Sequence, residues 1–481
     1  MPVNLPTDAY AASLVFHAGA EYWLERTASG KDLVVKGADA HTLGAFKGRT
    51  EGGVFRAAAS PENAKALRDT LPWLKPRRWG LETSAGTGDR LGLCTPGHAR
   101  AFSAVPGVNP VFAQQSTREM GRTHRTARNV LDEATWGAFE AGWTRGVGAD
   151  ADHQKTEQSL SECAQAGFVF FTIDPGDDMD MAAHTDDEGT VRAKGAALDF
   201  SSIDTSADDL ASRYVGRTLD LESGPLVLDE ESVWRAIAKA GPAIVRGARL
   251  MRHVDSLGVE REYEFAIDET DEPTTPVEHA VIVSELNRLG LNVVSFAPRW
   301  VGQFEKGIEY IGSKEALRTD FRRHAELARA LGPYKLSLHS GSDKFSIYPA
   351  FAEETRGVCH LKTAGTSWVE ALRIVARHDP ALLREVLALS LESFEENRHS
   401  YHLSCDPAKI PANPADDQMA DLITVLDSRQ VIHVGYGVVL EQLGPRVKDI
   451  LRAHEEELYG TIADHFITHL APFAPTARST S

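Results

Sequence analysis

The sequence contains few cysteines and no long apolar run. Four cysteines occur in 481 residues, and none has a CxxC or zinc-finger spacing: Cys94, Cys163, Cys359 and Cys405. This scarcity argues against a disulfide framework and against a structural zinc site. Nowhere do about 18 apolar residues follow one another, so we expect no membrane-spanning helix. Together these absences predict a soluble protein of a reducing compartment, the cytoplasm.

Positive charge is scarce relative to negative charge. The chain carries 51 Lys and Arg residues against 69 Asp and Glu residues, a net charge of −18. Nucleic acid and anionic membranes would be repelled by this charge, so we expect neither as a partner. The glycine pattern GxGxxG is also absent, which argues against a bound dinucleotide. A small-molecule substrate is expected, and a homo-oligomer is left open.

Eight short apolar runs, each followed by polar or glycine-rich residues, dominate the chain. This pattern is typical of buried parallel strands, and helical segments separate several of the runs. The sequence therefore predicts an α/β fold, a (β/α)8 barrel of the TIM type. The runs are RLGLCTPGH (90–98), FVFFTID (168–174), EYEFAIDE (262–269), NVVSFAPR (292–299), KLSLHS (335–340), GVCHLKTAG (357–365), YHLSCD (401–406) and VIHVGYG (431–437).

The spacing of these runs suggests how the chain is divided. Residues 1–88 precede the first run and are expected to form an N-terminal cap region. Residues 89–470 would form the barrel, and an insertion at 175–261, after the second run, is long enough to act as a lid. The last residues, 471–481, are expected to form a loose tail.

Ionisable residues stand near the C-terminal ends of the predicted strands, where TIM barrels place their reacting groups. Strand side chains alternate in direction, so each run divides into two faces. In EYEFAID the bulky Tyr263 and Phe265 suit the helix layer, which turns Glu264 and Asp268 toward the barrel axis. Other runs direct Asp174 and His339 to the same axis. Charges that converge in this way predict an active site.

Two imidazoles and a carboxylate from different strands are the usual ligands of a catalytic divalent metal. We predict Glu264, His339 and His433 as this set. Asp268 is an alternative to Glu264, since sequence does not fix their depth in the barrel. Histidines and carboxylates at strand ends also act as bases without a metal, so the pattern is only moderately specific.

Cationic residues offer further candidates. Lys362 has three interpretations: a cation that neutralises an oxyanion or carboxylate, a member of an internal ion pair, or a nucleophile that forms an imine. Arg299 follows a proline at a strand end and is suited to hold a carboxylate. Lys344 stands beside the turn that begins at Ser340, whose amides suit an anion.

Several of these segments resemble the tagaturonate epimerase family over roughly residues 90–440. The resemblance is carried by FVFFTIDPGDDMD, EYEFAIDETDEPTTPVEH, SFAPRWVGQFEKGIEYIG, SLHSGSDKFSIYP, HLKTAGTSWVEALR and VIHVGYGVVL. It implies an enzyme that interconverts tagaturonate and fructuronate by inverting the fourth carbon of a six-carbon keto acid. Related tagatose 4-epimerases act on tagatose and fructose with a divalent metal. The implied cofactor is Zn, Mn, Ni or Co.

The fourth carbon of a 2-keto sugar has no acidic hydrogen, so enolisation of the ketone does not invert it. Two routes to inversion remain: retro-aldol cleavage followed by recombination on the other face, or transient oxidation of the fourth hydroxyl. In the first route we expect Asp268 or Asp174 to move the hydroxyl proton and Lys362 to balance charge. Arg299 or Lys344 would hold the substrate carboxylate.

Two hydroxyl residues and several rival functions complete the hypothesis. Thr172 and Ser116 would orient substrate hydroxyls, although capping or packing is an equal alternative for both. A metal-dependent aldolase or ketose isomerase is the nearest rival, because both stabilise an enediolate. A sugar-acid binding protein without catalysis is a more distant one.

Overall fold

The computed structural model describes residues 5–28, 30–399, 401–412 and 414–475. Eight strands close into a barrel in the order β12-β13-β14-β15-β6-β7-β8-β9, which confirms the predicted fold class. The strands are β6 (Ser84–Gly86), β7 (Asn109–Ser116), β8 (Gly148–Gln154), β9 (Phe170–Ile173), β12 (Glu262–Ala266), β13 (Ser295–Ala297), β14 (Lys335–Leu338) and β15 (Cys359–Lys362).

The chain forms two compact units. The first comprises residues 1–77, 86–149 and 364–470, and the second comprises 78–85, 150–363 and 471–481. In the second unit β8 pairs with β9, β9 with β12, and each later strand with the next, all in parallel. Their shared direction brings the C-terminal ends of these strands to one end of the sheet.

Five of the eight predicted strand runs are confirmed, and they all lie in the second unit. Strand β9 falls within 168–174, β12 within 262–269, β13 within 292–299, β14 within 335–340 and β15 within 357–365. The predicted alternation on β12 also holds. Phe265 stacks on Phe296 with ring centroids 6.3 Å apart, and Glu264 points to buried polar partners instead.

The other three predicted strands are wrong. At 90–98 the chain turns, because the Asp89 carboxylate accepts backbone N–H groups of Leu91, Gly92 and Cys94, and helix α3 (Thr95–Ala104) follows. Residues 401–406 contain no strand. There the backbone N–H of Cys405 donates to the side chain of Gln430, so a helix side chain takes the place of a neighbouring strand.

The run at 431–437 is helical. It spans the end of α17 (Leu426–Val434) and the start of α18 (Tyr436–Ala453). A helix buried on most sides is apolar throughout, so a short run of it resembles a strand. Gly435 here meets a close neighbour, since a Cβ would lie 2.5 Å from the Ser390 Oγ. The glycine reflects close packing of helices.

The three missed strands are β6, β7 and β8. Strand β6 has only three residues, and β8 reads GADADHQ, with little apolar character. The outward residues of β8 are small alanines, while its aspartates contact buried polar groups. A strand whose inner face is charged therefore carries no hydrophobic signal.

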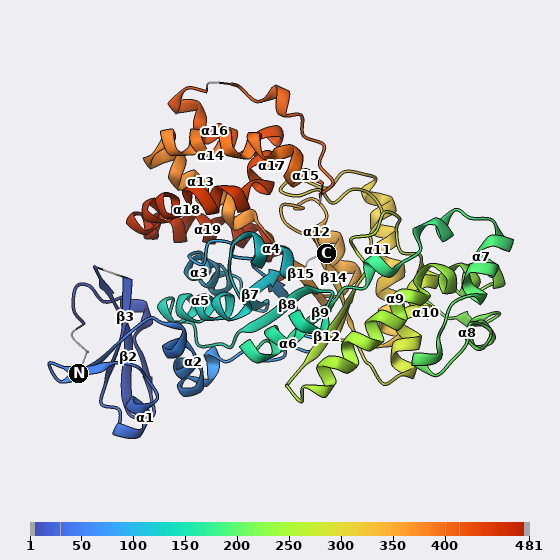
Figure 1. The fold of residues 1–481 in the computed structure, drawn as a ribbon, viewed down its shortest axis with the longest axis horizontal. Coiled ribbons are helices and arrows are strands. Elements are labelled where there is room, and N and C mark those ends of the chain that lie inside the picture. The colour runs from blue at the N-terminus through green and yellow to red at the C-terminus, as the bar shows by residue number, and fades with distance from the viewer. Residues whose placement is uncertain (1–4, 29, 400, 413, 476–481) are drawn as a thin grey trace. The chain divides into compact units, whose positions relative to one another are not determined.

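Helices of the second unit cover the strands and build the insertion. Gly247 of α9 lets the helix approach the sheet, because a Cβ there would lie 2.3 Å from the Phe265 ring; Figure 1 shows α9 beside α10. The elements are α6 (Glu157–Ala166), η3 (Gly176–Asp178), η4 (Met181–His184), α7 (Glu188–Ala196), η5 (Ser201–Ile203), α8 (Ala207–Tyr214), β10 (Thr218–Leu219), β11 (Leu226–Val227), α9 (Glu230–Ser256), α10 (Pro276–Arg288), α11 (Lys314–Leu331), α12 (Tyr348–Glu354) and η8 (Ala471–Phe473).

The first unit contains an antiparallel sheet and a set of helices. The sheet has the order β1-β2-β3-β5-β4 and lies within the predicted cap region. Its elements are η1 (Ala11–Ser13), β1 (Val15–His17), β2 (Ala20–Thr27), β3 (Gly30–Lys36), α1 (Ala40–Gly44), β4 (Arg49–Glu51), β5 (Val54–Ala58), α2 (Pro61–Thr70) and η2 (Pro72–Leu74). Residues 1–4 of the predicted cap and 476–481 of the predicted tail lie outside the described residues.

The remaining helices of the first unit lie between β7 and β8 or follow β15. Figure 1 shows α13, α14, α16, α17, α18 and α19 grouped together. The helices of this unit whose bounds have not yet been given are α4 (Thr117–Arg122), α5 (Ala127–Glu140), α13 (Thr366–His378), α14 (Pro380–Glu392), α15 (Phe394–Arg398), η6 (Pro407–Lys409), η7 (Asp416–Gln418), α16 (Met419–Leu422) and α19 (Glu455–Leu470). Among the helices described, none is both long and apolar enough to cross a bilayer.

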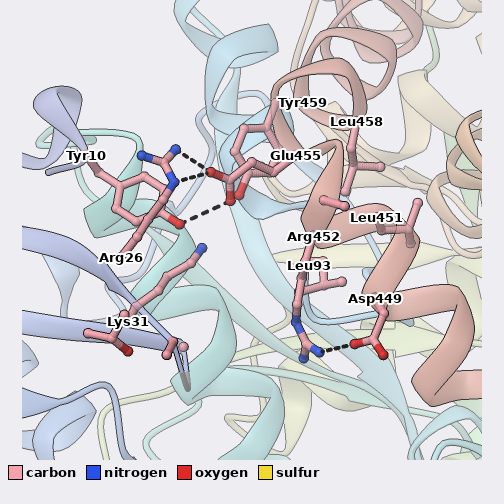
Figure 2. Close-up of a pocket in the computed structure, with 14 residues that line it drawn as sticks. Tyr10, Arg26, Lys31, Leu93, Asp449, Leu451, Arg452, Glu455, Leu458 and Tyr459 are labelled. Carbon is pink, nitrogen blue, oxygen red and sulfur yellow. Dashed lines mark hydrogen bonds and ion pairs between the residues drawn. The ribbon is translucent and has the colours of Figure 1, made fainter. Parts of the chain in front are cut away.

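A cavity of about 490 Å³ lies between the N-terminal sheet and α19. Tyr10 and Arg26 both donate to the Glu455 carboxylate, at 3.1 and 2.7 Å, as Figure 2 shows. The Arg26 guanidinium also lies 3.9 Å from the centre of the Tyr10 ring. The hydrogen-bonding groups of Tyr10, Arg26 and Glu455 are thus already paired with one another. These contacts attach the sheet to the helix, and they are typical of an internal interface more than of an active site.

Candidate functional site

Glu264 occupies the middle of β12 and is fully buried. The Ser295 hydroxyl donates to its carboxylate at 2.6 Å, and the Lys362 ammonium lies 2.8 Å away. Burial raises the pKa of Glu264, but the charges of Lys362 and His339 outweigh burial and hold the pKa well below its usual value. Glu264 is therefore a fixed negative charge inside the barrel.

Lys362, the last residue of β15, lies within 2.8 Å of three carboxylates: Asp150, Asp152 and Glu264. Burial lowers the pKa of Lys362, but the charges of Asp150 and Asp152 raise it well above its usual value. Burial raises the pKa of Asp150 to about 7. A protonated ammonium is not a nucleophile, so the geometry favours the ion-pair interpretation of Lys362 over the imine.

His339 follows β14 and lies between two carboxylates. Its Nε2 is 2.6 Å from Glu264 Oε1, and its Nδ1 is 2.8 Å from Asp268 Oδ1. Burial lowers the pKa of His339, but the charge of Asp268 helps to raise it above its usual value. Histidines that bind metals commonly donate their other ring N–H to a carboxylate, and Glu264 is placed for that role.

His153, at the end of β8, has the same arrangement. Its Nδ1 is 3.0 Å from Asp174 Oδ2, and its ring packs edge-on against His339 with centroids 4.9 Å apart. Burial lowers the pKa of His153, but the charges of Asp152 and Asp268 raise it to about 10. The backbone of His153 is left-handed, with φ 46°, a strained conformation that is frequent at functional sites.

His153, Asp268 and His339 form what we call the barrel cluster. One ligand atom from each residue lies within 4.8 Å of the others. Two imidazoles and a carboxylate suit a divalent transition metal. The carboxylates around both histidines raise their pKa values and make the site negative, so an ion would take the place of the ring protons there. The residues present therefore fit a divalent cation.

Most of the predicted catalytic residues lie together in the second unit. Asp174, Glu264, Asp268, His339 and Lys362 are linked by the contacts above, and Thr172 donates to Asp150 at 2.9 Å and to Glu264 at 3.2 Å. His433 lies buried on helix α17 in the first unit. The sequence predicts His433 as a ligand because residues 431–437 resemble a barrel strand. That reason is wrong, since these residues are helical.

The predicted substrate-binding residues have various partners. Arg299 donates to the backbone carbonyls of Thr270 and Trp300, at 3.1 and 2.8 Å. Lys344 donates to three backbone carbonyls, those of Glu305, Ile308 and Ser342, so it fastens one loop to another.

Both predicted serines take part in local structure. The Ser340 hydroxyl accepts a hydrogen bond from Lys306 at 2.7 Å, and its φ is 48°. Ser116 caps helix α4 in a reciprocal capping box with Glu119. This geometry corresponds to the capping alternative that the sequence leaves open for Ser116.

Sequence reasoning missed His153, Asp150 and Asp152, which all lie on β8. The available signal was the alternation Asp150, Asp152 and Gln154 against Ala149 and Ala151. Period-two polarity predicts a strand even where its apolar face is reduced to alanine.

Comparison with known proteins identifies the family. The profile of the tagaturonate epimerase family matches residues 10–473. The tagaturonate/fructuronate epimerase of Thermotoga maritima is 40% identical over 470 residues, which cover 96% of each chain. This chain belongs to the tagaturonate epimerase family.

Solved structures agree with the family assignment. Two crystal structures of the fructuronate-tagaturonate epimerase of Cohnella laeviribosi, native and with one glycerol bound, superimpose with a TM-score of 0.91. Each is 31% identical to this chain and covers 97% of it and 96% of the crystallised chain. The family consists of isomerases, so the chain is an enzyme of the epimerase type.

Proposed function

We propose that this enzyme interconverts tagaturonate and fructuronate by inverting the fourth carbon, with a divalent metal ion in the barrel cluster. The observation that carries the proposal is the convergence of His153, Asp268 and His339 beside the buried Lys362 network. The names of the relatives supply the substrates. A neutral ketose pair, tagatose and fructose, is a further substrate class for the same site.

The ion would be held by His153, Asp268 and His339. When bound, it supplies a Lewis acid that polarises the ketone and its neighbouring hydroxyl oxygen. Glu264 holds His339 from the opposite ring nitrogen, and Asp174 holds His153 in the same way. These two carboxylates fix the orientation of the imidazoles, so the ligand nitrogens are preorganised.

Inversion at the fourth carbon proceeds by cleavage and re-formation of one bond. A carboxylate at the strand ends, Asp174 or Asp268, takes the proton of the fourth hydroxyl. The bond between the third and fourth carbons then breaks, its electron pair enters an enediolate, and the fourth carbon becomes an aldehyde. After the aldehyde turns, the bond re-forms on the other face and the proton returns.

Lys362 supplies a permanent positive charge behind the reacting groups. Its ammonium contacts Asp152, the residue before His153, and Glu264, which holds His339. It therefore offsets the carboxylates and keeps the site from repelling a negatively charged intermediate. Arg299, half-buried after β13, has further N–H groups for the substrate carboxylate.

The test is to incubate the purified enzyme with fructuronate and to follow the product by NMR. We expect tagaturonate to form, EDTA to abolish turnover, and Zn, Mn, Ni or Co to restore it. Two accumulating fragments would identify an aldolase instead, and an aldose would identify an isomerase. Tight binding without turnover on any hexuronate would identify a binding protein.

Asp268→Asn separates the two roles open to Asp268. If Asp268 is a metal ligand, the variant loses both bound metal and activity. If it is only the base, metal content stays at the level of the unmodified enzyme while activity falls. Asp177→Asn, which changes an exposed carboxylate on the loop after β9, is the matched control.

A further inference from the structure

A second group of two imidazoles and a carboxylate lies in the first unit. His378 ends α13, His454 separates α18 from α19, and Glu457 stands in the first turn of α19. One ligand atom from each lies within 4.8 Å of the others. We call this group the peripheral cluster. The proposed mechanism uses none of its members.

The two imidazoles of the peripheral cluster lie face to face. Their ring centroids are 3.5 Å apart and their planes differ by 11°. Two protonated rings at this distance would repel each other, so the arrangement requires at least one neutral ring. Partial burial, with the charges of His454 and Arg377, lowers the pKa of His378. Neutral imidazole is the form that binds metals.

Glu457 completes the group. Its Oε2 lies 2.7 Å from His378 Nε2, and its other oxygen pairs with Arg377. The side chains of His378 and Glu457 are each 28% exposed, so solvent reaches the cluster and can supply the remaining positions around an ion.

From this geometry we propose that His378, His454 and Glu457 form a second metal site, specific for a transition-metal ion such as Zn²⁺. Because the rings are stacked, their nitrogen lone pairs lie in two nearly parallel planes, and one ring must turn about its Cβ–Cγ bond for both to reach one ion. The ion would join the end of α13 to the break between α18 and α19. Imidazole donors favour Zn²⁺, Ni²⁺ or Co²⁺ over Mg²⁺ and Ca²⁺.

The experiment titrates the chelator-stripped full-length enzyme with ZnCl₂ by calorimetry and measures its melting temperature with and without zinc. His454→Ala removes one donor from the peripheral cluster, and His378→Ala removes another. His41→Ala, which changes an exposed histidine on α1, is the matched control. MgCl₂ tests ion selectivity.

We expect His454→Ala and His378→Ala each to bind one zinc ion fewer per chain than the unmodified enzyme. Zinc should also raise the melting temperature of these two variants less than it raises that of His41→Ala. Epimerase activity of both variants with barrel metal restored should stay within twofold. The proposal is wrong if both variants titrate like the unmodified enzyme, or if His41→Ala loses the same zinc. Because barrel metal and activity are measured separately, failure here leaves the proposed function standing.

Discussion

The barrel cluster and the peripheral cluster contain the same donor types in very different surroundings. In the barrel cluster each imidazole has a carboxylate on its second nitrogen, Asp174 for His153 and Glu264 for His339. In the peripheral cluster the imidazoles stack face to face, whereas those of the barrel cluster meet edge-on, and solvent reaches the peripheral group. Donor identity alone therefore does not make a catalytic centre. Burial and orienting partners distinguish a reactive site from one suited only to binding.

The charged network beside the barrel cluster is buried, whereas the ion pair of the peripheral cluster, between Arg377 and Glu457, is reached by solvent. Lys362 connects the carboxylates beside both cluster histidines. A low-dielectric interior strengthens these interactions, so losing one member should affect the whole site.

The largest effect is expected from His339→Ala. Removing a ligand should lower kcat/KM about 10³-fold or more, since several kcal/mol of charge stabilisation are lost. Product formation from fructuronate, followed by NMR at saturating metal, measures this loss. His454→Ala is the matched histidine variant, with activity expected within twofold. Comparable losses in the two variants would contradict the distinction between the clusters.

The second largest effect is expected from Lys362→Met, as a loss in the free energy of unfolding. This change leaves three buried carboxylates without their cation, and a broken buried ion pair typically costs about 3–5 kcal/mol. Urea unfolding of the metal-free enzyme measures the free energy of unfolding. Lys155→Met, which removes a half-exposed ammonium from Asp174 and Asp177, should cost at most about 1 kcal/mol. Equal costs would show that the Lys362 network is not a stabilising core.

Much of the barrel could be predicted because its helix-facing residues are bulky. Tyr263 and Phe265 mark one face of β12, so Glu264 and Asp268 could be assigned to the other. Strand β8 was not predicted because its outward residues, Ala149 and Ala151, are too small to give an apolar pattern. The same strand carries His153, so the missed strand and the missed ligand have one cause.

His433 shows the opposite error. The run VIHVGYG is apolar and bounded by glycine, a pattern shared by buried strands and buried helices. Its helical state depends on packing against distant residues, such as Trp368, whose indole donates to the Ile432 carbonyl at 3.0 Å. A resemblance over the same segment identified the family correctly without fixing its secondary structure.

Asp174→Asn tests the orienting carboxylates, and a smaller effect is expected. The amide still contacts His153 but carries no charge, so metal affinity should fall about 10–100-fold, with kcat largely restored at saturating metal. Metal titrations of activity measure both quantities. Asp177→Asn, on the same loop and exposed, should leave the metal affinity unchanged. A loss of kcat that excess metal does not restore would instead identify Asp174 as the proton-transferring base.

The smallest effect is expected from His378→Ala in the absence of zinc. Its contact with Glu457 is solvent-accessible, and such pairs contribute about 0–1 kcal/mol because water and salt screen them. Urea unfolding of the zinc-free protein should therefore hardly change, whereas adding zinc should separate the variant from the unmodified enzyme. A large loss of stability without zinc would mean that the stacked rings are themselves a structural contact. The stability of the peripheral cluster would then come from ring packing, whereas that of the barrel cluster comes from charge pairing.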